Sequence, residues 1–366
     1  MKKIGILTFH NAHNWGAALQ VYALKKYLIK KGYNVSVINY KNHTIESNYL
    51  YSQPIKYKVK SLKSCLKYFF LVLERLYARK QYVQKWEKFN RFIQKIIDNQ
   101  VEVSKLREIE KMKYNYIICG SDQIWNYTLT NGFDKAYFCD FKTDAVKISY
   151  AASMGLKCLP KQEEEEFKNY IQNFDYISVR EEELKKYINS LVDNKVEVVL
   201  DPTLLLEKED YNEIEQEINI GRYLLVYTLK DDKKLMKISK YIAKKMNLKI
   251  IELRYEKTLK RIGKHQIANV GPEDFLGLIN NAEFIITNSF HGTVFSIIYN
   301  KLFYTIPVNA VNSRIENLLT LTKLNRRLIN SIEDVNLEDD INFEMAMNCI
   351  KKNKKISEEF LEMALK

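Results

Sequence analysis

Residues 3–39 read KIGILTFHNAHNWGAALQVYALKKYLIKKGYNVSVIN, and this run sets the fold class of the chain. Residues 3–9 are β-rich, residues 16–31 carry apolar side chains at helical spacing, and residues 34–39 are β-rich again. A strand, a helix and a strand with short connections form a βαβ unit, which implies a parallel sheet. The run therefore predicts an α/β protein.

The same rhythm returns in two series further along the chain. The first series has predicted strands at 115–119, 148–152, 176–179 and 196–199, with helices at 163–174 and 181–189. The second series has predicted strands at 222–229, 249–253, 283–287 and 302–306, with helices at 233–246, from Pro272 onward, and at 292–299. Each series is long enough to form its own parallel sheet with helices on its faces.

Two series predict two Rossmann-like domains. We expect the first over 1–200, with a basic helical insertion at about 55–97, and the second over 201–330, followed by a helical tail at 331–366. Open parallel sheets bind ligands at the carboxyl ends of their strands. The ligand is therefore expected in a cleft between the two domains.

The charge of the chain is concentrated in one segment. The 366 residues carry a formal charge of +13, and residues 56–95 hold twelve Lys or Arg and only two acids. Because aromatic side chains are interleaved there, we expect peripheral contact with an anionic membrane. The alternative is a solvated helical face with its aromatic residues in the core. Nucleic acid is not expected, because no recognition motif accompanies the charge.

The apolar run at the amino terminus is short and ends at His10, which does not suit a signal peptide. No segment approaches the length of an apolar membrane span. We therefore expect a cytoplasmic protein, peripheral at the inner membrane face. The five cysteines form no C-x-x-C pair, and Cys119 and Cys158 are expected as buried free thiols.

The sharpest candidate site lies in residues 285–294, IITNSFHGTV. A strand runs through a short polar turn into a helix, which places His291 at the helix N-terminus, where unpaired N–H groups attract anions. Ser289, Gly292 and Thr293 would assist in binding there, and His291 can donate a proton or hydrogen bond. The alternative is a histidine that only caps the helix.

A second candidate is Arg180, at the carboxyl end of the predicted strand 176–179. A guanidinium there can grip a carboxylate or a phosphate with two hydrogen bonds. The alternative is a salt bridge with Glu181 or Glu183.

Two further turns carry polar side chains suited to a sugar. The first follows the strand at 115–119 and contains the candidates Gly120, Ser121, Asp122, Gln123, Trp125 and Asn126. In it Trp125 could stack on a sugar ring, or alternatively could lie in the core behind an N-capped helix. The second turn follows the first strand and contains the candidates His10, Asn14 and Trp15, or is alternatively a plain polar loop.

Several common motifs are absent from the sequence. It contains no G-x-G-x-x-G, no G-x-x-x-x-G-K-[ST], no H-E-x-x-H and no G-x-S-x-G. No D-x-D occurs either, so the metal clamp of many nucleotide-sugar transferases is not expected.

In their order along the chain, these motifs resemble the polysaccharide pyruvyl transferase family over about residues 3–325. The resemblance rests on the first turn with Gly16, on residues 120–126 and 150–153, on Ser178-Val179-Arg180-Glu181, on Asp201-Pro202-Thr203 and on residues 288–292. It implies a glycosyltransferase-B-type architecture, phosphoenolpyruvate as donor, and a ketal formed on two sugar hydroxyls. It also implies that Arg180 holds the donor, that His291 is the general acid, and that no metal or organic cofactor is needed.

Two other readings stay open from the sequence. One is a metal-independent nucleotide-sugar glycosyltransferase of the same fold. The other is a non-catalytic sugar-binding subunit of a polysaccharide assembly complex. The acceptor would be a sugar or a lipid-linked oligosaccharide, and the sequence does not name it.

Overall fold

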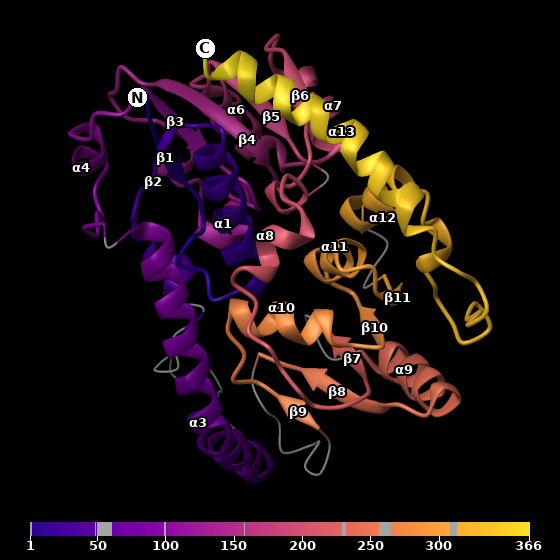
Figure 1. The fold of residues 1–366 in the computed structure, drawn as a ribbon. Helices are drawn as coiled ribbons and strands as arrows, with labels where there is room; N and C mark the ends of the chain where they lie inside the picture. Colours follow the sequence, from indigo (N-terminus) through magenta and orange to yellow (C-terminus); the bar gives the residue numbers. More distant parts are fainter. Residues whose placement is uncertain are drawn as a thin grey trace. The chain divides into compact units, whose positions relative to one another are not determined.

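The computed structural model describes residues 2–47, 49, 61–98, 100–156, 158–228, 232–255, 265–307 and 313–366. The chain divides into two compact units, each with its own sheet (Figure 1). Unit 1 comprises residues 1–49, 93–207 and 347–366, and unit 2 comprises residues 50–92 and 208–346.

Unit 1 contains a six-stranded parallel sheet in the order β2-β1-β3-β4-β5-β6. Its strands are β1 (Lys3–Leu7), β2 (Asn34–Val37), β3 (Tyr116–Cys119), β4 (Val146–Ala152), β5 (Tyr176–Val179) and β6 (Val196–Val198). Its longer helices are α1 (Trp15–Lys30), α6 (Lys161–Ile171) and α7 (Glu182–Leu191). Its short helices are α2 (His43–Ser47), α4 (Leu106–Glu110), α5 (Tyr127–Thr130), η1 (Lys135–Phe138) and η2 (Pro202–Leu204).

Unit 2 contains a five-stranded parallel sheet in the order β11-β10-β7-β8-β9. Its strands are β7 (Tyr223–Tyr227), β8 (Lys249–Leu253), β9 (Gln266–Ile267), β10 (Phe284–Thr287) and β11 (Leu302–Thr305). Its helices are α8 (Lys208–Asn212), α9 (Lys233–Met246), α10 (Pro272–Asn280), α11 (Phe290–Ile298), α12 (Ser313–Leu321) and η4 (Asn325–Arg327). Together the two sheets confirm the predicted α/β class.

The sheet of unit 2 is buried on both faces, as the alternation of side chains along a strand requires. Leu224 and Val226 of β7 pack with the apolar residues of α9 in one cluster. Tyr223 and Tyr227 point the other way, toward α10. The Tyr223 hydroxyl donates to the Leu278 carbonyl at 2.7 Å, and the centroid of the Tyr227 ring lies 5.4 Å from that of Phe275. This two-sided burial explains why the predicted strands are continuous apolar runs.

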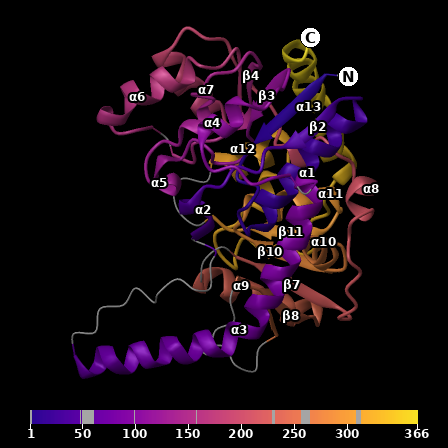
Figure 2. The same cartoon turned by 90° about the vertical axis from the view of Figure 1, so that its left-hand side faces the viewer.

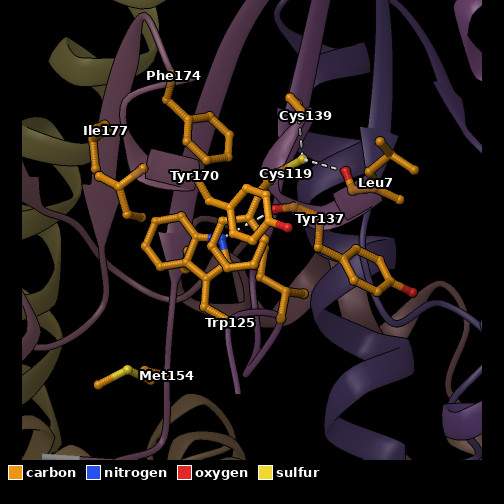
Figure 3. Packing of buried hydrophobic residues seen from close by; sticks show 14 of the residues in the cluster. Leu7, Cys119, Trp125, Tyr137, Cys139, Met154, Tyr170, Phe174 and Ile177 are labelled. Carbon is orange, nitrogen blue, oxygen red and sulfur yellow. Dashed lines mark hydrogen bonds between the residues drawn. The ribbon is translucent and has the colours of Figure 1, made fainter. Parts of the chain in front are cut away.

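The main core cluster of unit 1 lies on one face of its sheet and is rich in aromatic rings (Figure 3). Trp125 is fully buried in it, with its ring stacked at 5.8 Å on Phe138 and its Nε1 donating to the Tyr137 carbonyl at 3.2 Å. Cys119 and Cys139 are also buried there as free thiols, with their sulfurs 3.2 Å apart. Cys158 is exposed, so the prediction that it is buried was wrong.

The carboxyl-terminal helix α13 (Phe343–Ala364) returns to unit 1 from residue 347 onward. The Ser357 hydroxyl accepts a hydrogen bond from the Leu200 amide at 2.9 Å, and the ring of Phe360 lies 6.3 Å from Tyr150. The predicted helical tail is therefore part of the packing of the amino-terminal sheet.

The basic insertion forms one helix of 36 residues, α3 (Leu62–Ile97). Residues 55–60 of the predicted insertion lie outside the described residues. Most of α3 belongs to unit 2, and its last residues belong to unit 1. Among the described residues, no helix combines the length and the apolar character needed to cross a membrane.

Candidate functional site

Each sheet has a point at which its strand order reverses, and ligands in this class of fold bind at the carboxyl ends of the strands there. In unit 1 this point lies between β1 and β3, and in unit 2 it lies between β7 and β10. The sequence motifs can be judged by whether they fall at these two places.

The His291 motif falls at the reversal point of unit 2. It follows β10 directly, and the Asn288 amide donates to the Thr228 hydroxyl at 2.9 Å, which links the ends of β10 and β7. Ser289 caps α11, since its hydroxyl accepts from the Gly292 amide at 3.3 Å. His291 is the second residue of α11 and is 8% exposed, with its ring edge-on to Phe290 at 5.1 Å.

Gly292 lies where a side chain has no room. A Cβ atom at this position would be 2.4 Å from Thr287 Oγ1 and 2.9 Å from Tyr227 Cδ1. The glycine therefore lets the first turn of α11 approach the strands closely. Thr293 is fully buried, and its hydroxyl bonds to the Ser289 carbonyl at 3.0 Å and to the Thr305 hydroxyl at 2.9 Å. Its hydroxyl thus ties α11 to β11.

Arg180 lies at the carboxyl end of β5 and is surrounded by acids. Its side chain is 3% exposed, and its NH1 lies 2.7 Å from Asp201 Oδ2. Its other nitrogens lie 3.5 Å from Glu181 Oε1 and 3.9 Å from Asp122 Oδ1. Burial lowers the pKa of Arg180, but the three carboxylates outweigh that effect, and the net pKa is raised. The alternative partner Glu181 is therefore present beside the guanidinium.

Asp201, to which the sequence analysis assigned no role, organises this cluster. Its Oδ1 accepts from the Thr203 amide at 3.0 Å and from the Thr203 hydroxyl at 2.6 Å, while its Oδ2 faces Arg180. The Ser121 hydroxyl lies 3.4 Å from the same Oδ2. The signal in the sequence was Asp201-Pro202-Thr203, a cap for a short helix directly after β6.

Glu181 is held by a second buried contact. The Ser153 hydroxyl, which follows β4, donates to Glu181 Oε1 at 2.7 Å. Residues after β3, β4, β5 and β6 therefore meet around one guanidinium, because the carboxyl ends of neighbouring parallel strands share one edge of the sheet.

The turn after β3 is shaped by its backbone. Gly120 has φ +120°, and a Cβ there would lie 2.3 Å from the Tyr150 carbonyl oxygen. Ser121 is fully buried, with its amide bonded to Gln20 Oε1 at 3.2 Å and its hydroxyl to the Ala151 carbonyl at 2.9 Å. Asp122 has φ +73°, and its side chain is 18% exposed beside Arg180.

The rest of this turn serves local structure. Asn126 caps α5 by accepting from the Thr128 amide at 3.1 Å, and its Nδ2 donates to Gln123 Oε1 at 3.0 Å. Trp125 presents no exposed face, so the idea that it stacks on a sugar was wrong and the alternative of a core residue holds. Trp125 and Asn126 of this turn therefore stabilise the local fold, and Asp122 is the charged residue of the turn that lies near Arg180.

The turn after β1 is likewise tied into unit 1. His10 is buried, with Nδ1 3.2 Å from the Thr8 carbonyl and Nε2 3.1 Å from Asn39 Oδ1. Burial lowers the pKa of His10, and these two hydrogen bonds oppose that effect. Asn14 caps α1 by accepting from the amides of Gly16 and Ala17 at 3.0 and 3.2 Å, and Trp15 is fully buried.

Comparison with solved structures shows the fold. The S. aureus MnaA–UDP co-structure is 14% identical, with 99% of this chain and 95% of that chain covered and a TM-score of 0.50. The UDP-GlcNAc 2-epimerase from Methanocaldococcus jannaschii is 15% identical, with 99% of both chains covered and a TM-score of 0.50. The glycosyltransferase SnogD from Streptomyces nogalater is 10% identical over 100% and 99%, with a TM-score of 0.44. The architecture is glycosyltransferase-B-like, as predicted.

Comparison of the sequence itself gives the family. No curated protein matches the chain. The family model described as polysaccharide pyruvyl transferase matches residues 14–309, which includes the turns at Gly120, Arg180, Asp201 and His291. With more than three quarters of its length matched and the predicted motifs at the carboxyl edges of both sheets, this chain belongs to the polysaccharide pyruvyl transferase family and is a transferase.

Proposed function

We propose that this transferase moves the pyruvyl group of phosphoenolpyruvate onto two hydroxyls of one sugar, forming a cyclic ketal. The sugar would belong to a surface polysaccharide or to its lipid-linked precursor. The observation that carries the proposal is the position of His291, on the first turn of α11 at the strand-order reversal of unit 2. The roles of residues are proposed one by one, each from the geometry of its own unit.

For the donor, the N-terminus of α11 supplies what an anion needs. Amide groups of the first turn and the helix dipole favour negative charge there. Ser289 and the close approach allowed by Gly292 shape this turn, and Thr293 fixes it to β11. His291 in its imidazolium form would donate a proton to the methylene carbon of phosphoenolpyruvate.

For Arg180 we propose contact with the donor carboxylate or phosphate. Asp201 lies within normal hydrogen-bonding distance of the guanidinium at 2.7 Å, whereas the carboxylates of Glu181 and Asp122 lie farther away, at 3.5 and 3.9 Å. A donor anion would replace these two longer contacts and leave the Asp201 contact in place. Asp201 would then hold the guanidinium in one orientation, which a bidentate grip requires.

The reaction can be balanced with these groups. His291 protonates the methylene carbon, and the first sugar hydroxyl adds to the neighbouring carbon and loses its proton to a carboxylate, for which we propose Asp122. The bond from that carbon to the phosphate oxygen then breaks. The second hydroxyl adds to the same carbon and gives its proton to the imidazole of His291. Asp122 gives the proton that it took from the first hydroxyl to the departing phosphate.

The acceptor residues and the location are part of the same proposal. Among the predicted acceptor residues, Asp122 carries the charged group nearest to Arg180. Because phosphoenolpyruvate is a cytoplasmic metabolite, the reaction would occur in the cytoplasm, and a lipid-linked acceptor would place the enzyme at the inner membrane face. Neither a metal ion nor nucleic acid has a role in the proposal.

The test is thermal melting of the full chain with phosphoenolpyruvate, for the wild type and three variants. A ligand at 100 times its dissociation constant should add about 2.7 kcal/mol to the free energy of unfolding. Arg180→Lys keeps the positive charge but cannot form the bidentate hydrogen bonds of a guanidinium. His291→Gln keeps a polar side chain but removes the proposed general acid. His265→Gln changes an exposed histidine of unit 2 and serves as the control.

We expect the wild type and His265→Gln to shift upward in melting temperature, and Arg180→Lys to shift less. His291→Gln should still bind the donor but form no pyruvylated sugar in a mass-spectrometric assay. If uridine diphosphate raised the melting temperature and millimolar phosphoenolpyruvate did not, the proposal would fail in favour of the nucleotide-sugar glycosyltransferase.

A further inference from the structure

The first half of α3 carries an apolar surface that the described residues leave open. In Figure 2 this part of the helix stands apart from the other helices and strands of its own unit. Several large side chains there are more than half exposed, including Leu66 at 55%, Phe69 at 56%, Phe70 at 57% and Leu76 at 59%. Exposure of four such neighbours on one helix is unusual for a surface that only meets water.

These side chains form one stripe. Their spacing of three and four residues places them on a single side of a helix with about 3.6 residues per turn. The apolar stripe consists of Leu66, Phe69, Phe70, Leu73, Leu76 and Tyr77.

The second half of α3 packs on unit 2 through a different side. Lys85 donates to the Tyr255 carbonyl at 2.8 Å, Lys88 pairs with Asp274 at 2.8 Å, and Asn269 donates to Gln84 at 3.1 Å. Ala78, Tyr82, Lys85 and Phe89 are buried on this side. At about 100° per residue, their centre lies roughly 150° around the helix from the centre of the apolar stripe. The stripe is therefore not an extension of the core contact.

The charge beside the apolar stripe indicates what covers it. Between Ser61 and Lys80 there are five Lys or Arg and one acid, a net charge of +4. An amphipathic helix with aromatic residues on one side and Lys or Arg on the other suits an anionic lipid surface. A second copy of the same helix would bring like charges together, and the heptad spacing of the stripe ends after two repeats at Lys80.

We propose that the first half of α3 lies in the interface of an anionic membrane, with the apolar stripe inserted among the lipids and its Lys and Arg near the headgroups. The sequence analysis expected membrane contact somewhere within residues 56–95. The proposal assigns that contact to one side of residues 62–80 of α3. The proposal needs neither donor nor acceptor. Its outcome is therefore separable from that of the proposed transferase reaction.

The test is co-sedimentation of the full chain with vesicles of phosphatidylcholine alone or with one quarter phosphatidylglycerol. The wild type should bind the anionic vesicles at 50 mM salt and lose binding at 500 mM, because salt screens the headgroup charge. Phe69→Ser/Phe70→Ser should weaken binding about tenfold or more, since two large apolar groups leave the lipid phase. Tyr68→Ser, on another side of the same helix, and Ile356→Ser on α13 are the matched controls and should bind as the wild type does.

Three results would overturn the proposal. The first is absence of co-sedimentation with anionic vesicles at low salt. The second is unchanged binding by Phe69→Ser/Phe70→Ser, which would show that charge alone attracts the chain. The third is a concentration-dependent dimer, seen by analytical ultracentrifugation and abolished by that double substitution, which would show that a second copy covers the stripe.

Discussion

The carboxylate cluster around Arg180 makes a sharp prediction about stability. In Arg180→Met, the carboxylates of Asp201, Glu181 and Asp122 lose the cation between them. The side chains of Asp201 and Glu181 are 0% and 7% exposed, so water cannot replace the guanidinium there. Removal of one partner from a buried ion pair typically costs about 3–5 kcal/mol, and we expect Arg180→Met to lie in that range.

Asp201→Asn should lower the free energy of unfolding less than Arg180→Met does. Asp201→Asn keeps an oxygen for the Thr203 amide and hydroxyl, and Arg180 keeps two carboxylates nearby. Loss of one charged hydrogen bond is worth about 1.5–3 kcal/mol. The double variant Arg180→Met/Asp201→Asn should lose less free energy of unfolding than the two single variants lose together, because the two residues contact each other.

Urea unfolding followed by tryptophan fluorescence suits this test, because the buried Trp15 and Trp125 both report on unit 1. Lys135→Met is a matched control in the same unit. Its pair with Asp140 at 3.1 Å is at the surface, with side chains 57% and 35% exposed, and should be worth less than about 1 kcal/mol. If Arg180→Met also lowered the free energy of unfolding by less than about 1 kcal/mol, the buried carboxylates would not depend on the guanidinium, and the prediction would be refuted.

Three other substitutions test the remaining assignments. Burial lowers the pKa of His10 from its usual 6.5, so the unfolded chain binds a proton first and stability should fall below about pH 6.5; His10→Gln should flatten that slope in urea titrations. Gly292→Ala would place a Cβ 2.4 Å from Thr287 Oγ1 and should cost about 1–3 kcal/mol, and an unchanged urea midpoint would contradict this. Trp125→Ala should cost about 3–5 kcal/mol by the same measurement, whereas a sugar-stacking residue would lower acceptor affinity at constant stability.

The motifs that the sequence singled out lie at the carboxyl edges of the two sheets. Asn288, Ser289 and His291 follow β10, and Asp122 and Arg180 follow β3 and β5. Alternation and helical spacing are local properties, so the positions of strands, helices and the turns between them could be read in order. That reading placed His291 at a helix N-terminus.

Partners distant in sequence could not be read in this way. Asp201 meets Arg180 across 21 residues, and Ser153 meets Glu181 across 28 residues, because β4, β5 and β6 lie side by side in the sheet. The same holds for Trp125, which looks suited to a sugar in a polar turn but packs against Phe138 in the core.

By itself, the sequence determined the α/β class, the two series of strands and helices, the basic insertion and the family, since these depend on local patterns and on residue identity. Only the tertiary structure decided which polar side chains stay accessible, which acids surround Arg180, and which side of α3 faces outward. It also brought α13 back to the amino-terminal sheet. Strand order and burial set these features, because both bring together residues whose separation along the chain carries no periodic signal.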